Sequence, residues 1–417
     1  MRIQRNTYLN RLIESRHNNM IKIITGVRRC GKSYLLFNLF SDWLTKEGVD
    51  DAHIIKIDLE NRRNRKLRNP DVLLEHIDSK MIDDKMYYIL IDEIQLVDEF
   101  EDVLNSYLKI ENADVYVTGS NARFLSKDVI TTFRGRGEEI KVYPLSFREY
   151  ISAMDGPVDI IFEEYMTYGG LPQIVEYNSA KRKVEYLKAL LAETYLTDIK
   201  ERYQIRNDEE LEILLDIISS SIGSLTNPRK LANTFETEKK VKLSDKTIKT
   251  YLDYICDSFL VEKAVRYDVK GKKYIDTPYK YYFADLGLRN ARLNFRQLEK
   301  THMMENVIYN ELRIRGYNVD VGVVPIIIRD KEGKQKRVNY EIDFVCNKGN
   351  QRYYIQSAYR LDSDEKVRQE ENSLRNTGDS FKKIIIVGNP ILVERDNSGI
   401  TTISIYDFLL KENSLEL

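Results

Sequence analysis

Residues 26–33, GVRRCGKS, fit the pattern G-x-x-x-x-G-K-[ST] at every fixed position. Loops of this pattern hold the phosphates of a nucleotide on backbone N–H groups at the start of a helix. Lys32 is expected to reach the β- and γ-phosphates, and the Ser33 hydroxyl to bind Mg²⁺. The residues expected to contact the nucleotide are Gly26, Val27, Arg28, Arg29, Cys30, Gly31, Lys32, Ser33 and Tyr34.

A phosphate loop needs a neighbouring strand that brings a carboxylate to the metal, and residues 87–93, YYILIDE, fit that requirement. Five bulky residues suit a strand that is buried on both faces, and two acids end it. Asp92 is expected to hold Mg²⁺ through water, and Glu93 to orient the attacking water and remove its proton. Two adjacent carboxylates at the tip of a buried strand are costly unless a cation lies there.

A third strand is expected at residues 114–118, DVYVT, and it is followed by Gly119, Ser120 and Asn121. Asn121 is a candidate to contact the γ-phosphate or to position the attacking water. The sequence Gly-Ser-Asn is also typical of an ordinary turn, so both interpretations stay open.

The elements around these motifs predict an α/β domain over residues 1–150. MIKIIT (20–25) is typical of a short strand before the loop, and YLLFNLF (34–40) continues after it at helical spacing. We therefore expect a P-loop ATPase domain that binds ATP and magnesium. The basic run NRRNRKLR (61–68) either contacts nucleic acid or forms a solvated loop.

The composition limits the class of protein. A chain of 417 residues is long enough for two to four domains, and its 65 Lys and Arg residues balance 66 Asp and Glu, so nucleic-acid binding requires local patches. The three cysteines form no CxxC pair and the four histidines show no ligand spacing, so no metal other than magnesium is implied. Without a long apolar run or a signal-peptide core, a cytoplasmic protein with no membrane partner is expected.

Residues 151–205 are expected to form a helical connector, in which YGGLP (168–172) makes a sharp turn and a hinge. Residues 206–292 have the layout of a winged helix, with three helices followed by a hairpin whose turn is the basic KGKK (270–273). Many such domains bind DNA through a helix and the hairpin, and many others bind protein. The sequence leaves both alternatives open.

Residues 293–417 are expected to form a helix, several strands and a helix, with acids on one face of the strand at 337–346. This order resembles the PD-(D/E)XK nuclease fold. Glu305 and Asp343 match its helix and strand acids, and Gln356 takes the place of the third acid. The lysine position is Ala358, so the cation that would hold the attacking water is missing there. Arg360, two residues on and on the same face of the strand, is a candidate substitute, but it cannot act as a base near neutral pH. The resemblance implies a degenerate fold retained for binding, with cleavage as the alternative.

Across the whole chain, one series of motifs resembles the bacterial and archaeal AAA-type ATPases that carry a C-terminal domain of unknown function. The motifs are GVRRCGKS, YYILIDEIQ, VYVTGSNARFLS, FRGRGEEIKVYPLSFREY and YGGLP. In that family an arginine after the third strand is a candidate catalytic contact to the nucleotide. The match falls on Arg136, with Arg134 as its neighbour, although a cation at this position also suits a helix cap or a solvated loop.

We therefore expect an α/β fold in which a P-loop, AAA-like domain precedes a winged helix and a small restriction-endonuclease-like domain. The expected function is a Mg²⁺-dependent ATPase that couples ATP binding and hydrolysis to DNA binding or remodelling. Two alternatives are an ATP-gated switch that binds a protein partner and an ATP-regulated nuclease. Whether the chain forms a homo-oligomer stays open.

Overall fold

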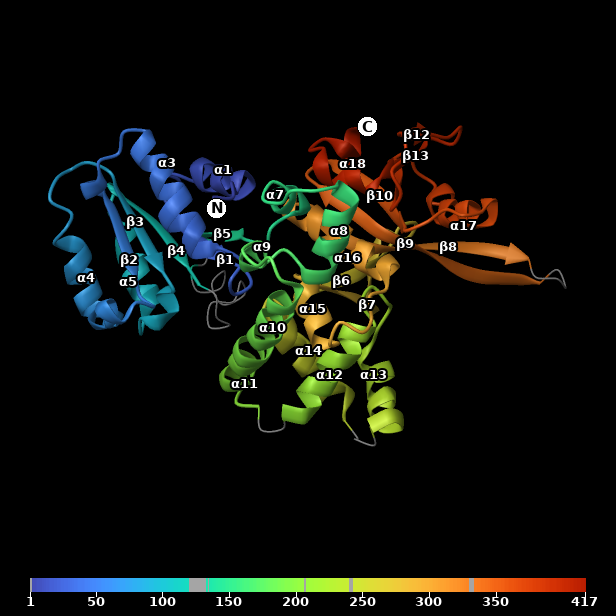
Figure 1. Cartoon of the computed structure of the whole chain (residues 1–417), viewed down its shortest axis with the longest axis horizontal. Coiled ribbons are helices and arrows are strands. Elements are labelled where there is room, and N and C mark those ends of the chain that lie inside the picture. The colour runs from blue at the N-terminus through green and yellow to red at the C-terminus, as the bar shows by residue number, and fades with distance from the viewer. Residues whose placement is uncertain (1, 120–132, 134, 206–207, 240–242, 330–333) are drawn as a thin grey trace. The chain divides into compact units, whose positions relative to one another are not determined.

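The structure is a computed structural model that describes residues 2–119, 133, 135–205, 208–239, 243–329 and 334–417. The chain folds into two compact units, each with its own sheet (Figure 1). Unit 1 comprises Met1–Pro144, Leu171–Glu176 and Tyr195–Ile205. Unit 2 comprises Leu145–Gly170, Tyr177–Thr194 and Arg206–Leu417.

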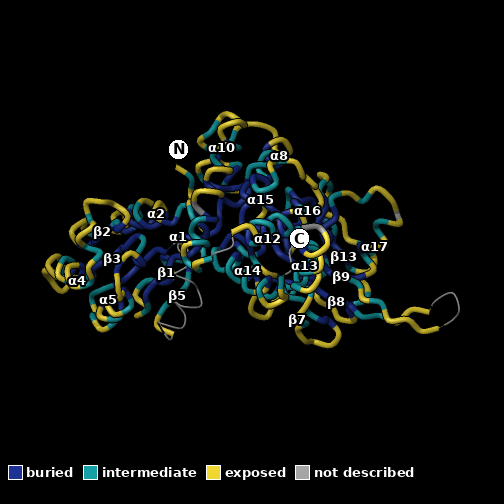
Figure 2. Tube along the Cα trace, turned by 90° about the horizontal axis from the view of Figure 1, so that it is seen from below, coloured by how far each residue is buried: buried dark blue, intermediate teal, exposed yellow. Residues whose placement is uncertain are grey.

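Unit 1 contains a five-stranded parallel sheet in the order β2-β3-β4-β1-β5. Its strands are rich in isoleucine, valine and tyrosine, and every residue of β1 and β3 is buried, as a sheet covered on both faces requires (Figure 2). The predicted strands at 20–25, 87–92 and 114–118 are confirmed. The strand bounds are β1 Ile21–Thr25, β2 Ile54–Asp58, β3 Tyr87–Asp92, β4 Ala113–Thr118 and β5 Gly137–Lys141.

Helices cover both faces of this sheet. Alternate strand residues such as Ile23 and Ile89 share a core with α4 and α5, whereas on the other face the Phe40 ring lies 4.6 Å from that of Tyr116. The helix predicted after the loop is confirmed as one continuous run from Lys32 to Lys46. The helical bounds in unit 1 are α1 Asn6–Glu14, α2 Lys32–Tyr34, η1 Leu35–Phe40, α3 Ser41–Lys46, η2 Asp51–His53, η3 Arg62–Arg68, α4 Pro70–Asp78, η4 Ile94–Leu96, α5 Phe100–Tyr107, α9 Pro172–Val175 and α11 Thr197–Tyr203.

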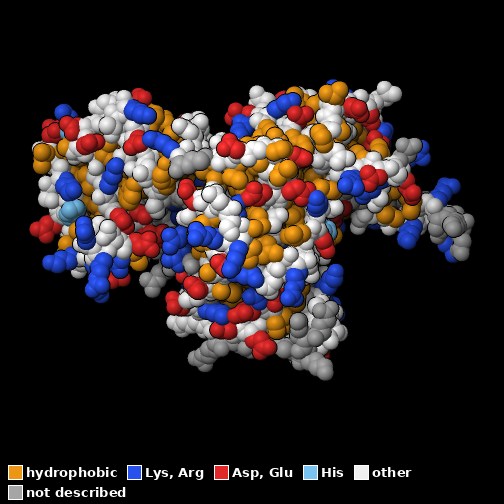
Figure 3. All heavy atoms as spheres, in the orientation of Figure 1, with side chains coloured by type: hydrophobic (Ala, Val, Ile, Leu, Met, Phe, Trp, Pro, Cys, Tyr) orange, Lys and Arg blue, Asp and Glu red, His pale blue; other side chains and the backbone are white. Residues whose placement is uncertain are grey.

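Unit 2 contains an eight-stranded mixed sheet in the order β12-β13-β11-β10-β9-β8-β6-β7. The long strands β8 and β9 pair antiparallel and extend as a two-stranded arm (Figure 1), over which basic side chains are exposed (Figure 3). The strand bounds are β6 Val261–Asp268, β7 Lys273–Phe283, β8 Asn318–Arg329, β9 Gln335–Lys348, β10 Gln351–Ala358, β11 Lys382–Val387, β12 Glu394–Arg395 and β13 Ile400–Ser404.

The helices expected in unit 2 form where the capping residues predict them. Asn227 caps α13 with Pro228 as its first residue, and the Ser244 hydroxyl caps α14. The helical bounds are α7 Phe147–Ile151, α8 Val158–Tyr168, α10 Ala180–Leu190, η6 Leu191–Leu196 (which runs on into unit 1), α12 Asp208–Ser220, α13 Pro228–Thr234, η7 Phe235–Lys239, α14 Asp245–Asp257, α15 Leu286–Arg292, α16 Lys300–Ile314, α17 Asp364–Arg375, α18 Ile405–Leu410 and η8 Ser414–Glu416. Among the described residues, no helix combines the length and apolarity that crossing a bilayer needs.

The hairpin β6–β7 differs from the expectation in its partners. Three helices and a hairpin do occur in the expected order, but β6 also pairs in parallel with β8 over Arg266–Asp268. The hairpin therefore belongs to the same sheet as the C-terminal strands, and the boundary expected between residues 292 and 293 falls inside one compact unit. The pairing of β6 with β8, between residues 55 positions apart such as Arg266 and Val321, cannot be read from the local pattern of residues 206–292.

Candidate functional sites

The phosphate loop leaves the carboxyl end of β1 and leads into α2. Gly26 and Gly31 have φ angles of 136° and 98°, in the left-handed region that favours glycine. A Cβ on Gly26 would lie 2.0 Å from the backbone oxygen of Val142, so no larger residue fits there. The two fixed glycines of the motif are thus required by the course of the backbone itself.

The lysine of the motif lies over its own loop. Lys32 is buried, and its Nζ donates to the backbone oxygens of Gly26 and Val27 at 3.1 Å each. A second buried cation, Arg5, also contacts the loop. Its guanidinium donates to the backbone oxygen of Cys30 in the loop at 2.9 Å and to that of Tyr143 at 2.6 Å. The loop is therefore fixed by side chains on both sides.

The carboxylate predicted to serve the metal lies beside the motif serine. Asp92 ends β3 and Thr118 ends the neighbouring β4, and the Thr118 hydroxyl donates to Asp92. Burial raises the pKa of Asp92, while hydrogen bonding to the Thr118 and Ser33 hydroxyls opposes that rise. A buried carboxylate next to a serine hydroxyl at a phosphate loop is a donor set that suits Mg²⁺. The structure thus brings Ser33 and Asp92 together.

Glu93 follows Asp92 at the same edge of the sheet. It has a φ of 55°, and its backbone N–H donates to the Thr118 hydroxyl at 3.0 Å. The side chain of Gln95 donates to the Glu93 carboxylate, which is half-buried. The unusual backbone angle turns this carboxylate away from the direction of β3, and the hydrogen bond from Gln95 restricts it.

A helix from the connector contacts the phosphate loop within unit 1. Arg28 Nη1 lies 2.8 and 2.6 Å from the two carboxylate oxygens of Asp198 in α11, and the Tyr195 hydroxyl donates to the Arg28 backbone oxygen at 2.8 Å. Burial raises the pKa of Asp198, and the Arg28 guanidinium opposes that rise. Residue 28 of the loop is thus held through both its side chain and its backbone.

Arg136 does not join this site in its own chain. It immediately precedes β5, whose first residue, Gly137, pairs with the first residue of β1, Ile21. Arg136 therefore lies at the amino edge of the parallel sheet, whereas the loop leaves the carboxyl edge. A five-residue strand spans roughly 16 Å, which an arginine side chain cannot bridge. Asn121 and Arg134 lie outside the described residues.

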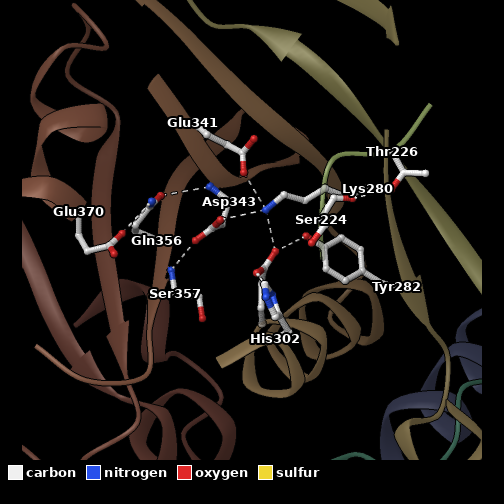
Figure 4. Close-up of polar contacts among 11 residues, drawn as sticks. Ser224, Thr226, Lys280, Tyr282, His302, Glu341, Asp343, Gln356, Ser357 and Glu370 are labelled. Atoms are coloured by element: carbon white, nitrogen blue, oxygen red, sulfur yellow. Dashed lines mark hydrogen bonds and ion pairs between the residues drawn. The ribbon is translucent and has the colours of Figure 1, made fainter. Parts of the chain in front are cut away.

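A second cluster of charged side chains lies in unit 2, where β7, α16 and β9 converge (Figure 4). Lys280 Nζ lies 2.8 Å from Glu305 Oε1, 2.9 Å from Glu341 Oε1 and 3.1 Å from Asp343 Oδ1. The Lys280 side chain is only 3% exposed. A lysine from another strand thus lies among the predicted acids, whereas the position at which the resemblance places a lysine is Ala358.

Two features bring Lys280 to the acids. First, β6 pairs with β8 only over Arg266–Asp268, and Ala264, the partner of Lys280 in the hairpin, lies outside this pairing. Second, the Asn306 side chain exchanges two hydrogen bonds with the backbone of Phe283, at 2.8 and 2.7 Å, which fixes α16 against β7. The Tyr282 hydroxyl also donates to Glu305 at 2.7 Å.

Gln356 has a supporting position instead of a place among the acids. Its amide oxygen accepts from the Asp343 backbone N–H at 3.1 Å, and its amide nitrogen donates to Glu370 at 3.0 Å. The third carboxylate at Lys280 is that of Glu341, two residues before Asp343 on the same face of β9. The Asp343 carboxylate also accepts from the Ser357 backbone N–H at 2.9 Å.

The charges in this cluster are mutually dependent. Burial by itself would lower the pKa of Lys280, but the carboxylates of Glu305, Asp343 and Glu341 raise it well above its ordinary value. Burial raises the pKa of Asp343 despite the nearby Lys280 ammonium. The lysine therefore stays protonated near neutral pH and cannot act as a base there.

Two family models match separate segments of the chain. Residues 18–151 match the model of an AAA domain, and residues 160–299 match that of a domain of unknown function, DUF8612. An uncharacterized protein of Haemophilus influenzae is 33% identical over 415 residues, or 98% of this chain and 99% of that protein. The chain belongs to this family of AAA-domain proteins. An uncharacterized protein of Methanocaldococcus jannaschii is 30% identical over 363 residues, 84% of this chain and 77% of that protein.

Solved structures show only distant similarity. The Orc1 protein of Aeropyrum pernix in complex with DNA aligns with 70% of this chain and 93% of its own at 13% identity, with a TM-score of 0.29. AMPPCP-bound DnaA of Aquifex aeolicus aligns with 60% of this chain and 86% of its own at 12% identity, with a TM-score of 0.30. Scores this low carry no argument about the function of this chain.

The functional residues that sequence reasoning missed lie far from any motif. Lys280 falls inside the DUF8612 segment, whereas the three acids it contacts lie beyond residue 299. One available sign was a lysine within an aromatic strand, YKYYF (279–283), the end of which is buried. No sequence pattern marks Arg5 or Asp198 as supports of the loop of the AAA domain.

Proposed function

We propose that the AAA domain binds ATP with Mg²⁺ and hydrolyses it, and that this cycle changes how unit 2 binds DNA. The observation that supports the first part is the meeting of Lys32, Ser33 and Asp92 at the carboxyl edge of one parallel sheet. Lys32 and Ser33 come from the phosphate loop and Asp92 from the end of β3, and each suits one requirement of phosphoryl transfer.

In this proposal each side chain has a defined role. The Lys32 ammonium exchanges its two backbone oxygens for phosphate oxygens, and the loop N–H groups bind the β-phosphate. Magnesium, held by Ser33 directly and by Asp92 through water, neutralises charge on the β- and γ-phosphates. Glu93 orients the attacking water and accepts its proton, with Gln95 restricting the carboxylate.

DNA is the partner that the charge of the arm formed by β8 and β9 favours. The arm at 325–340 carries the exposed cations Arg329, Lys334, Lys336 and Arg337, and its described residues include no acid (Figure 3). The full sequence of this stretch contains five basic and two acidic residues. A two-stranded arm with this charge suits contacts to phosphate groups, whereas the chain as a whole has a net charge of −1. The winged-helix interpretation of residues 206–292 stays part of this proposal.

Arg136 has a place only in an oligomeric form of the proposal. Because it lies at the far edge of its own sheet, it would contact the ATP of a neighbouring copy if it contacts ATP at all. Arg136→Ala tests this: in an oligomer it lowers hydrolysis without lowering ATP binding, and mixing it with Lys32→Ala protein restores part of the rate. No restoration on mixing would remove this role.

The experiment for the main proposal separates binding from hydrolysis. Lys32→Ala should abolish measurable ATP binding, whereas Glu93→Gln should keep binding and lose about 100-fold or more in rate, as expected for a missing general base. Glu99→Gln is the matched control, since Glu99 is an exposed glutamate that also has a positive φ, of 53°. Equal rates for wild type and Glu93→Gln would refute the assignment.

The coupling to DNA needs its own measurement. Steady-state ATPase rates with duplex, branched and single-stranded DNA should change with at least one of them, and the change should fall with added salt because phosphate contacts release counterions. If no DNA alters the rate or binds, while ATP changes the oligomeric state, an ATP-gated protein switch describes the molecule better.

A further inference from the structure

The phosphate loop carries an arginine whose partner lies on a helix of the connector. Arg28 is the third residue of the motif, and its Nη1 lies 2.8 and 2.6 Å from the two carboxylate oxygens of Asp198. Asp198 lies in the first turn of α11, 170 residues further along the chain. The motif leaves position 28 open to any residue, so the pattern itself does not explain an arginine there.

The ion pair lies on the same side of the loop as the carboxylate proposed to activate water. Burial raises the pKa of Asp198, and the charges of Glu201 and Glu93 raise it further, which requires that both acids lie close to it. In the proposed reaction Glu93 faces the γ-phosphate across the attacking water. The Arg28 guanidinium, held by Asp198, therefore lies near the place that the γ-phosphate would occupy.

The Arg28 side chain can change partners at little cost. The two side chains of the pair are 36% and 25% exposed, and an ion pair that solvent reaches adds little to stability. The γ-phosphate of ATP carries more negative charge than a carboxylate, and its oxygens suit the donors of a guanidinium. The backbone of Arg28 is held separately, because the Tyr195 hydroxyl donates to its oxygen at 2.8 Å. The loop can therefore keep its course while the side chain turns.

We propose that Arg28 leaves Asp198 when ATP binds and contacts the γ-phosphate from within the same chain. The inference rests on the proposed hydrolysis of ATP by unit 1. In that reaction the water oxygen forms a bond to the γ-phosphorus, the bond from the γ-phosphorus to the bridging oxygen of ADP breaks, and Glu93 takes the proton of the water. Arg28 stays protonated and stabilises the charge on the transferred group.

The exchange distinguishes ATP from ADP and connects this difference to α11. ADP has no γ-phosphate, so Arg28 stays on Asp198. With ATP, Asp198 loses the Arg28 cation while Glu93 and Glu201 remain close to it, and repulsion between like charges then loosens the start of α11. The stretch Tyr195–Ile205 that contains α11 belongs to unit 1, whereas the chain before and after it belongs to unit 2. The γ-phosphate thus acts on a helix that is joined to unit 2 at both ends.

The test compares a non-hydrolysable ATP analogue with ADP, both with Mg²⁺, by calorimetry on the full-length protein, and adds steady-state ATP hydrolysis. Arg28→Ala should lower hydrolysis about 100-fold or more, as expected for a lost donor to the developing charge. It should also bind the analogue about tenfold less tightly and leave ADP binding nearly unchanged. Asp198→Asn should shift the affinity for the analogue in the opposite direction, to binding up to about fivefold tighter.

A pair that only shapes the loop gives another pattern. Both variants would then weaken the analogue and ADP alike, and this result would overturn the proposal. Arg2→Ala is the matched control, because Arg2 forms an exposed pair with Asp42 in unit 1 at 2.9 Å and should leave both affinities and the rate unchanged.

Hydrogen exchange of α11 gives a second measurement. The analogue should speed exchange in α11 relative to ADP in the wild type but not in Arg28→Ala, and equal exchange with the two nucleotides in the wild type would contradict the exchange of partners. If wild-type protein neither binds nor hydrolyses ATP, the proposed function fails together with this inference. If ATP hydrolysis survives Arg28→Ala unchanged, the inference alone fails.

Discussion

Replacing Lys280 by Met removes the ammonium that lies among three converging carboxylates while keeping most of the side-chain volume. Breaking a buried pair by removing one partner typically costs about 3–5 kcal/mol, because the other charge stays buried. The Glu305 and Asp343 side chains are 8% and 13% exposed, so this range applies to them. For a unit of this size, a loss of about 3–5 kcal/mol lowers the Tm of unit 2 in Lys280→Met by about 6–20 °C.

The assay must report on unit 2 separately. The only tryptophan of the chain, Trp43, lies in α3 of unit 1, so its fluorescence follows the unfolding of unit 1. Hydrogen exchange of α16 and β9 reports on the cluster itself. We expect faster exchange in α16 and β9 of Lys280→Met and an unchanged unfolding transition by tryptophan fluorescence. The difference in exchange between variant and wild type should be smaller at pH 5 than at pH 8, because at pH 5 the acids can take up protons.

The matched control is Lys300→Met, which breaks an exposed pair with Glu163 whose two side chains are 47% and 45% exposed. Exposed pairs contribute about 0–1 kcal/mol, so this variant should exchange nearly like wild type. If Lys280→Met behaves no differently from Lys300→Met, the ammonium does not compensate the buried acids. The reasoning about the charge of the cluster would then be refuted.

Three further predictions concern single positions. A hydrogen bond to the Glu305 carboxylate raises the pKa of His302 above its ordinary 6.5. His302→Gln should therefore lower the stability of unit 2 most below pH 6.5, and its effect should fade as the pH rises through the raised pKa. Denaturant titrations at several pH values measure this. Asp198→Asn frees the Arg28 charge, so ATP should bind up to about fivefold more tightly by calorimetry; weaker binding would mean that the pair instead shapes the loop. Gly26→Ala should abolish ATP binding and lower the stability of unit 1 by about 3 kcal/mol or more, measured by tryptophan fluorescence, because its Cβ would clash with a backbone oxygen.

The site in the AAA domain could be largely predicted from the sequence because its chemistry lies in contiguous motifs. The loop glycines and Lys32 are adjacent in the chain, and the carboxyl ends of parallel strands meet at one edge, so Asp92 had to lie near Ser33. Arg136 shows the limit: the family resemblance that made it a candidate did not reveal that it lies at the opposite edge of its own sheet, which depends on the direction of β5.

The cluster in unit 2 could be predicted only in part, because its members meet through sheet order and not through spacing. The resemblance to the PD-(D/E)XK fold indicated Glu305 and Asp343, which lie on the expected helix and strand. The approach of Lys280, 63 residues from Asp343, depends on the short pairing of β6 with β8, which no local preference specifies. Gln356 was expected in the place of the third acid, but the structure shows it bonded to the Asp343 backbone and to Glu370, and Glu341 is the third carboxylate at Lys280.

The division of this cluster between two segments limits where function can reside. The DUF8612 segment ends at residue 299 and contains Lys280, whereas Glu305, Glu341 and Asp343 follow it. A fragment ending at 299 would bury a lysine that lacks its carboxylates, and a fragment beginning at 300 would bury the carboxylates without the lysine. Since either charge left alone is strongly destabilising, the two segments must fold together. A fragment that keeps this cluster intact must therefore contain both Lys280 and the acids up to Asp343, and so extends beyond the DUF8612 segment.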